Sequence, residues 1–183
     1  MDTPAWARAA LRRVGHDPAL DGPAITVQRV ADRILGDGSL ARALQGDWLG
    51  HPLHPVLTDL PIGFWTSAFV LDLCGGRAGA RAARQMVAWG VLCALPTAAA
   101  GAADWREMDA EARRVGAVHA ALNTGAIALY VWSWKARRRH RLRGVLLGFA
   151  GATAATAAAY LGGELVFPSS EAPSEPPSDR YQA

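Results

Sequence analysis

"MVAWGVLCALPTAAAGAA", residues 86–103, contains no charged side chain. At a rise of about 1.5 Å per residue, a helix of this length crosses most of the roughly 30 Å hydrocarbon core of a bilayer. A second stretch, "GVLLGFAGATAATAAAYLGG" at residues 144–163, is also uncharged. A soluble four-helix bundle needs a polar face on each helix, with charges recurring every three or four residues. These two stretches therefore predict helices that lie in a membrane.

The chain of 183 residues holds four apolar stretches of this kind, and most of its charges lie in the connections and near the ends. We predict membrane helices at residues 56–73, 86–103, 116–134 and 144–166. The predicted fold class is all-α, with a four-helix transmembrane bundle over residues 48–167.

The two ends of the chain differ from the bundle in composition. Residues 1–47 form an arm in which "AWARAALRRV" and "ITVQRVADRIL" predict short amphipathic helices. This arm is expected to be solvated or to lie on the membrane surface. Residues 168–183 are rich in proline, serine and acidic residues, which predicts a disordered tail.

Basic residues predict the orientation in the membrane. The segment "KARRRHRLR" after the third span carries six Lys and Arg and no acid, and the connection after the first span carries Arg77, Arg81 and Arg84. By the positive-inside rule both connections lie in the cytoplasm, so both termini face outward from the cell membrane. The net charge of +3 is explained by this topology, and no nucleic-acid-binding motif accompanies it.

Tryptophans are expected to mark the two membrane–water interfaces. Trp48 and Trp105 fall at the predicted outer interface, and Trp132 and Trp134 fall at the inner one. Amphipathic rings favour this depth, where one edge contacts hydrocarbon and the other contacts water.

Seven polar side chains from four spans fall at the outer end of the predicted bundle. They are His51, His54, Asp59, Asp104, His119, Asn123 and Glu164. Ionisable groups within a membrane are costly and often functional, so these residues are candidates for a shared site.

Small residues predict which helix faces meet. Asp59 shares a stripe with Gly63, Thr66 and Ser67, and a spaced row of small residues leads to Asp104. His119 and Asn123 are four residues apart, and Gly144 and Gly148 form a GxxxG pair. Membrane helices pack through small residues, so we expect all these stripes to face inward. The row that leads to Asp104 consists of Gly90, Ala94, Thr97 and Gly101.

Prolines shape the local geometry of the candidate site. Pro52 and Pro55 favour an extended entry that holds His51 and His54 roughly 9 Å apart. Each histidine is therefore expected to meet a partner from another helix. Pro61 and Pro96 lie inside spans and free backbone carbonyls, which need neighbours, hydroxyls or water as partners.

The motifs resemble a known family. "GHPLHPVLTDLPIGFWTSAFVLDL", followed by "GAADW", "HAALNTGAIALY" and "AYLGGELVF", is similar to the bacterial membrane family catalogued as domain of unknown function 2231, over roughly residues 45–167. The resemblance implies four membrane helices, an undetermined activity and a frequent association with Rieske iron–sulfur domains. Its signature positions correspond to His51, Pro52, His54, Pro55, Asp59, Pro61, His119 and residues 160–163. Members commonly carry histidine after "YLGG", where this chain has Glu164.

Three functional hypotheses follow. The first is a membrane anchor or accessory subunit, whose polar residues cap and cross-link the bundle. The resemblance implies a redox system for it, with an iron–sulfur protein as partner. The second is an electron-transfer module, with haem b held by His119 and by His51 or His54, or with a quinone contacted by Asp59 and a histidine.

The third hypothesis is a divalent-metal or proton site, for which a homo-oligomer would be expected. Its mixed nitrogen and oxygen ligands would be His51, His54, Asp59, Asp104, His119 and Glu164. The sequence has no hydrolase triad, phosphate loop or nucleotide fingerprint, so we expect a non-catalytic protein.

Overall fold

The structure, a computed structural model, describes residues 4–36, 38–105 and 108–166, without the side chains of Glu164 and Val166. The predicted disordered tail lies outside the described residues. All regular structure in the described part of the chain is helical, as predicted. The elements are α1 (Ala5–Gly15), the 3₁₀ turn η1 (Pro18–Leu20), α2 (Asp21–Leu35), α3 (Ser39–Gln45), α4 (Leu53–Cys74), α5 (Gly76–Asp104), α6 (Ala110–Ala136) and α7 (Arg141–Val166).

Four helices of the described chain are long and apolar enough to cross a membrane, namely α4, α5, α6 and α7. They contain the four predicted spans, and each extends beyond its predicted range. The largest extension is at α5, which begins ten residues earlier, at Gly76. Its first turns, "GRAGARAARQ", are charged but rich in alanine and arginine, which are strong helix formers. The α5 helix therefore extends beyond its apolar run because the preceding residues have a high helix propensity.

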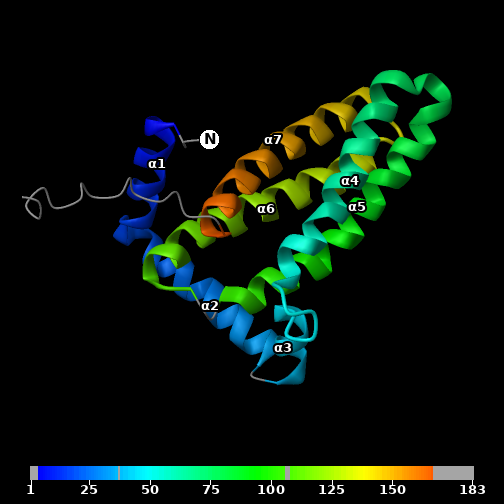
Figure 1. Cartoon of the computed structure of the whole chain (residues 1–183). Coiled ribbons are helices and arrows are strands. Elements are labelled where there is room, and N and C mark those ends of the chain that lie inside the picture. The colour runs from blue at the N-terminus through cyan, green and yellow to red at the C-terminus, as the bar shows by residue number, and fades with distance from the viewer. Residues whose placement is uncertain (1–3, 37, 106–107, 167–183) are drawn as a thin grey trace, which may run out of the picture.

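The four long helices form two antiparallel hairpins (Figure 1). One hairpin is α4 with α5, and the other is α6 with α7, while contacts between the hairpins are sparser. The starts of α4 and α6 lie at the same end of the bundle as α1–α3, and we call it the arm end. The opposite end, with the α4–α5 and α6–α7 connections, is the loop end. This arrangement brings the predicted site residues to the arm end.

Local features explain where several helices begin and end. Pro55 lies in the first turn of α4, where its missing N–H removes no helical hydrogen bond. The side chain of Asp109 caps α6 by accepting a hydrogen bond from the backbone N–H of Ala112 at 2.8 Å. Gly46 ends α3 in the left-handed conformation, with φ of 89°, close to the carbonyl of His51. These features fix how the chain enters the bundle.

The arm packs against the bundle. Trp105 is buried beneath α2 with Ala24 and Ala117, and a second cluster joins Leu35 and Ala41 to Ala103. The predicted helices in the arm are confirmed as α1 and α2, whereas α3 was not predicted. The prediction that Trp105 belongs to an aromatic belt is wrong, because only 3% of it is exposed.

Polar contacts also attach the arm to the bundle. Arg114 of α6 donates to Asp21 Oδ1 at 2.7 Å and to the carbonyl of Gly15 at 2.9 Å. Gln45 of α3 donates to the carbonyl of Ala103 at 3.3 Å. Together these contacts tie the arm helices to α5 and α6.

Candidate functional site

His54 links the two helices of the first hairpin. It lies in the first turn of α4, and its Nδ1 is 2.8 Å from the carbonyl oxygen of Thr97 on α5. With the proton on Nδ1, the ring donates to this carbonyl. Gly101 permits the approach, because a Cβ at that position would lie 2.9 Å from the imidazole. The structure thus confirms that His54 meets a partner from another helix.

His119 makes the same contact in the second hairpin. Its Nδ1 lies 2.7 Å from the carbonyl oxygen of Ala158 on α7, and Gly162 leaves room for the ring. The Nδ2 of Asn123 lies 3.0 Å from Nε2 of His119 and 3.1 Å from its carbonyl oxygen. When Nδ1 carries the proton, Nε2 accepts from this amide. Both nitrogens of His119 therefore have partners within the chain.

The two histidines face one another across the bundle. Their ring centroids are 6.1 Å apart, with an angle of 79° between the ring planes. The prediction that His119 and Asn123 face inward is confirmed, and so is the inward row on α5, because Gly90, Ala94 and Thr97 are buried. The structure thus brings His54, His119 and Asn123 together at the arm end.

The other predicted site residues lie apart from this group. His51 is exposed in the segment before α4, and Asp104 is half-buried at the end of α5. Glu164 belongs to α7, but its side chain lies outside the described residues. In the described chain, no three His, Cys, Asp or Glu side chains are grouped so that they would hold a metal ion.

Asp59 and its stripe face outward. Asp59, Gly63, Thr66 and Ser67 are all exposed, so the prediction that this stripe faces the interior is wrong. The physical reason is helix geometry: at 3.6 residues per turn, a residue five positions after His54 lies about 140° around the helix. A stripe through Asp59 cannot face the interior when His54 does.

Pro61 creates a second contact between α4 and α5. It is buried inside α4, and it has no N–H to donate to the carbonyl of Leu57. The hydroxyl of Thr97 lies 3.2 Å from that carbonyl and 2.8 Å from the carbonyl of Cys93. The predicted need for a neighbour to satisfy the freed carbonyl is thereby confirmed. Thr97 contacts α4 twice, through its hydroxyl and through its own carbonyl.

A buried ion pair at the loop end was missed by sequence reasoning. Arg137 of α6 donates to both carboxylate oxygens of Asp72 on α4, at 2.8 and 2.7 Å. The two side chains are 4% and 3% exposed. The signal in the sequence was an acid, Asp72, at the end of a span whose following connection carries only basic residues. Such a carboxylate needs a cation from the neighbouring basic segment.

Further contacts fix the arginine of this pair. The Nε of Arg137 donates to Ser133 Oγ at 3.1 Å, and that hydroxyl donates to the carbonyl of Gly144 on α7 at 2.6 Å. Gly144 and Gly148 are both buried against these side chains, which confirms the predicted GxxxG contact. Arg141 adds a second cation, 3.9 Å from Asp72.

Aromatic rings join the hairpins between these two polar clusters. Trp65 of α4 stacks on Tyr130 of α6, with ring centroids 3.9 Å apart and planes 11° apart. Gly90 of α5 lies directly against the Trp65 indole, and Gly151 of α7 lies against the Tyr130 ring. The centre of the bundle is therefore closed by two large rings.

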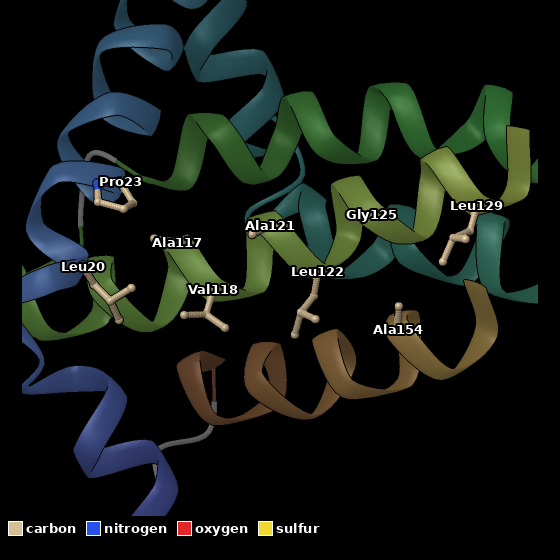
Figure 2. A pocket seen from close by; sticks show the side chains of 9 residues that line it. All are labelled: Leu20, Pro23, Ala117, Val118, Ala121, Leu122, Gly125, Leu129 and Ala154. Carbon is tan, nitrogen blue, oxygen red and sulfur yellow. The ribbon is translucent and has the colours of Figure 1, made fainter. Parts of the chain in front are cut away.

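Two cavities border the bundle. The first, of about 420 Å³, lies where α6 meets the start of α2, and apolar side chains such as Leu20, Val118 and Leu122 line it (Figure 2). The second, of about 360 Å³, lies between α4 and α7 and reaches Asp72 and Arg137. Neither of these two cavities is lined by His54 or His119.

The motifs and the four spans can now be set against known proteins. A family described as "Predicted membrane protein (DUF2231)" matches residues 50–170. The chain belongs to this family. The match begins just before His51 and covers α4 to α7, so the family corresponds to the four-helix bundle without the arm. It confirms the predicted family and the membrane character of the protein. No curated protein and no solved structure matches the chain.

Proposed function

We propose that the protein is a non-catalytic membrane anchor or accessory subunit. Its four-helix bundle would fix the arm at one membrane face, where the arm binds a partner. The observation that carries this proposal is the packing of the arm on the arm end of the bundle through two apolar clusters and the contacts of Arg114. An arm held in this way presents a constant surface to a partner.

Exposed apolar side chains support a binding role for the arm. Ile34 is 69% exposed and Leu40 is 56% exposed, and Trp48, directly after the arm, is 69% exposed. Such side chains are favourable where they contact a partner or the membrane interface. The family resemblance suggests a partner class, an iron–sulfur protein of the Rieske type in a redox system.

The interior polar residues favour a structural role over catalysis. His54, His119 and the Asp72–Arg137 pair each contact another helix of the same chain. Polar contacts between membrane helices contribute roughly 0.6–2 kcal/mol each. In this proposal they hold the bundle together, and Asp72–Arg137 connects the two hairpins.

The proposal includes a direction in the membrane. The loop end carries the exposed residues Arg138, Arg139 and Arg143, which the positive-inside rule places in the cytoplasm. The arm and both termini would then face outward. In a variant with Cys74→Ser and Arg139→Cys, the new thiol should resist a membrane-impermeant reagent in intact cells and react after lysis. Labelling in intact cells would reverse the direction.

A membrane-binding assay tests the anchoring role. We would co-express the full chain with a Rieske-type protein from the same organism and measure how much of the Rieske-type protein sediments with membranes. The proposal predicts that the Rieske-type protein sediments when the wild-type chain is present. It should be released when the chain carries Ile34→Glu together with Leu40→Glu. As a matched control, Leu73→Gln with Leu142→Gln changes two exposed apolar residues at the loop end and should have no effect. Equal sedimentation with both double variants, or with no chain present, would contradict the proposed role.

The histidine pair supports a second candidate function. In each histidine Nδ1 contacts a backbone carbonyl, an arrangement that leaves Nε2 as the ligating atom at many metal and haem sites. A haem or a divalent metal between α4 and α6 would use His54 and His119, after Asn123 had moved away from Nε2. This module would carry electrons or bind metal.

Spectroscopy separates the second candidate from the first. A haem site predicts a Soret band in protein from haem-replete cells, and a metal site predicts near-stoichiometric metal. Either signal should be lost in His119→Ala and kept in His51→Ala, because His51 is exposed and lies outside the pair. A colourless protein without stoichiometric metal would exclude this candidate under those conditions.

A further inference from the structure

The two hairpins repeat the same set of contacts. In the described part of the chain, three side-chain contacts between α4 and α6 connect residues 65 positions apart, namely His54 with His119, Trp65 with Tyr130, and Asp72 with Arg137. The helices that follow have their own constant offset of 61 residues, which relates Thr97 to Ala158, Gly101 to Gly162, and Gly90 to Gly151. Equivalent residues thus make equivalent contacts in the two hairpins. Positions where the equivalent contact is missing show where the hairpins differ.

The equivalence fails at the two flanks where the hairpins meet. Between α5 and α6, the guanidinium of Arg84 lies 4.9 Å from the centre of the Trp134 ring, and its Nε donates to the Trp134 carbonyl at 3.2 Å. On the opposite flank, the equivalent positions hold Val145 and Phe69. These two side chains cannot make a cation–π contact. The second flank lacks this cation–π contact, and Phe69 of α4 there meets Phe149 of α7 instead, with ring centroids 6.4 Å apart.

The second flank contains the cavity of about 360 Å³ between α4 and α7. Along α4 it runs from Ile62 to Asp72, ten residues, which corresponds to about 15 Å of helix. That is about half of the roughly 30 Å hydrocarbon core, the depth of one leaflet. Its wall is apolar apart from Thr66, Tyr130, Thr156 and the polar cluster at the loop end. The groove matches a hydrocarbon chain that enters from the loop end.

The polar end of the groove carries an excess positive charge. Asp72 is neutralised by Arg137 in a bidentate pair, and Arg141 lies beside this pair with 42% of its side chain exposed. Arg141 donates to the backbone carbonyl of Asp72 at 3.2 Å, which holds its guanidinium near the groove. A phosphate at this point would face one uncompensated arginine.

We propose that the groove between α4 and α7 binds one acyl chain of an anionic phospholipid from the leaflet at the loop end, with the phosphate held by Arg141. The medium around the bundle supplies this occupant, because Phe69 and Phe149 at the rim of the groove are 43% and 60% exposed on helices that cross the membrane. The bound acyl chain fills the flank between α4 and α7, which lies opposite the flank that Arg84 and Trp134 close.

The test compares lipid retention among variants of the full chain. Each protein is reconstituted in vesicles of equal parts phosphatidylglycerol and phosphatidylcholine, extracted into mild detergent and weighed by native mass spectrometry. The wild type should retain one phospholipid, with phosphatidylglycerol favoured about fivefold, the effect expected for one arginine near the headgroup. In Arg141→Gln the two lipids should be retained about equally. Arg139→Gln, an exposed arginine outside the groove, should behave as the wild type.

Filling the groove should remove the lipid itself. Ala155→Phe places a ring in the groove, and Ala159→Phe does so from an exposed position where misfolding is not expected. Both should lose the retained lipid, while Ala150→Phe, an exposed residue of α7 outside the groove, should keep it. Equal retention in all three, or equal retention of both lipids by the wild type, would overturn the proposal. A protein dimer that Ala155→Phe dissociates would assign the groove to a second copy instead, and would also overturn it.

Discussion

The buried pair of Asp72 and Arg137 gives the sharpest stability prediction, because its two halves are not equivalent. Asp72→Asn leaves Arg137, only 4% exposed, without its carboxylate, and it also removes the anion beside Arg141. Breaking a buried ion pair from one side costs about 3–5 kcal/mol. Since Arg141 is partly exposed at the loop end and can be hydrated, we expect a cost near the lower limit, about 3 kcal/mol.

The reverse substitution should cost less. In Arg137→Gln, Asp72 keeps Arg141 as a cation 3.9 Å away, and a glutamine remains able to donate to the carboxylate. The expected cost is about 1.5–3 kcal/mol, the range for a hydrogen bond to a charged group. The double variant should be less destabilised than the sum of the two by about 0.5–3 kcal/mol, since it leaves no half of the pair uncompensated.

Unfolding in mixed micelles, followed by tryptophan fluorescence and circular dichroism as the denaturing detergent fraction rises, measures these free energies. Arg139→Gln, at an exposed position of the same connection, serves as the control. The reasoning is refuted if Asp72→Asn unfolds within about 0.5 kcal/mol of that control, the range of ordinary surface substitutions. It is equally refuted if Arg137→Gln proves more destabilising than Asp72→Asn.

Two further predictions concern the packing of the bundle. Gly90→Ala should destabilise the protein by about 1–3 kcal/mol, because the added methyl group overpacks against the Trp65 ring. Gly125→Ala should be neutral or stabilising, because a Cβ there has no neighbour within 4 Å. Similar losses of stability in both variants would contradict the packing argument. Thr97→Val should cost about 1–3 kcal/mol of stability, because it leaves the Leu57 carbonyl unpaired. Adding Pro61→Ala should reduce that cost, because the restored N–H can donate to this carbonyl. A double variant whose loss of stability equals the sum of the two single losses would argue against this account.

The membrane bundle could be predicted because lipid imposes a strong constraint on composition. A run such as residues 86–103 has no alternative stable environment, so all four spans were located from hydropathy alone. Their ends were not, since Ala- and Arg-rich turns extend α5 beyond the apolar run. The short α3 was missed because seven residues between glycines carry too little periodicity.

The candidate site was predicted less completely. His54 and His119 were placed correctly because their depth in the membrane follows from the positions of the spans. Their partners were not predicted, because these are backbone carbonyls that the rings reach only where glycines of neighbouring helices leave room. Asp59 was placed on the wrong side, since a small-residue stripe does not fix the rotation of a helix. The pair of Asp72 and Arg137 was missed because hydropathy assigns spans and connections separately. In this pair, a residue near the end of one span contacts a residue of the connection after another.

In the anchor proposal, the polar residues inside the bundle connect its helices and do not act as ligands. The most direct test is an absorption spectrum with metal analysis of protein purified from haem- and metal-replete cells, measured together with the unfolding of His119→Ala. The account predicts a colourless protein without stoichiometric metal and a His119→Ala variant destabilised by about 1–2 kcal/mol, from the lost contact with Ala158. A Soret band or stoichiometric metal that disappears in His119→Ala would contradict it and identify the histidine pair as a cofactor site.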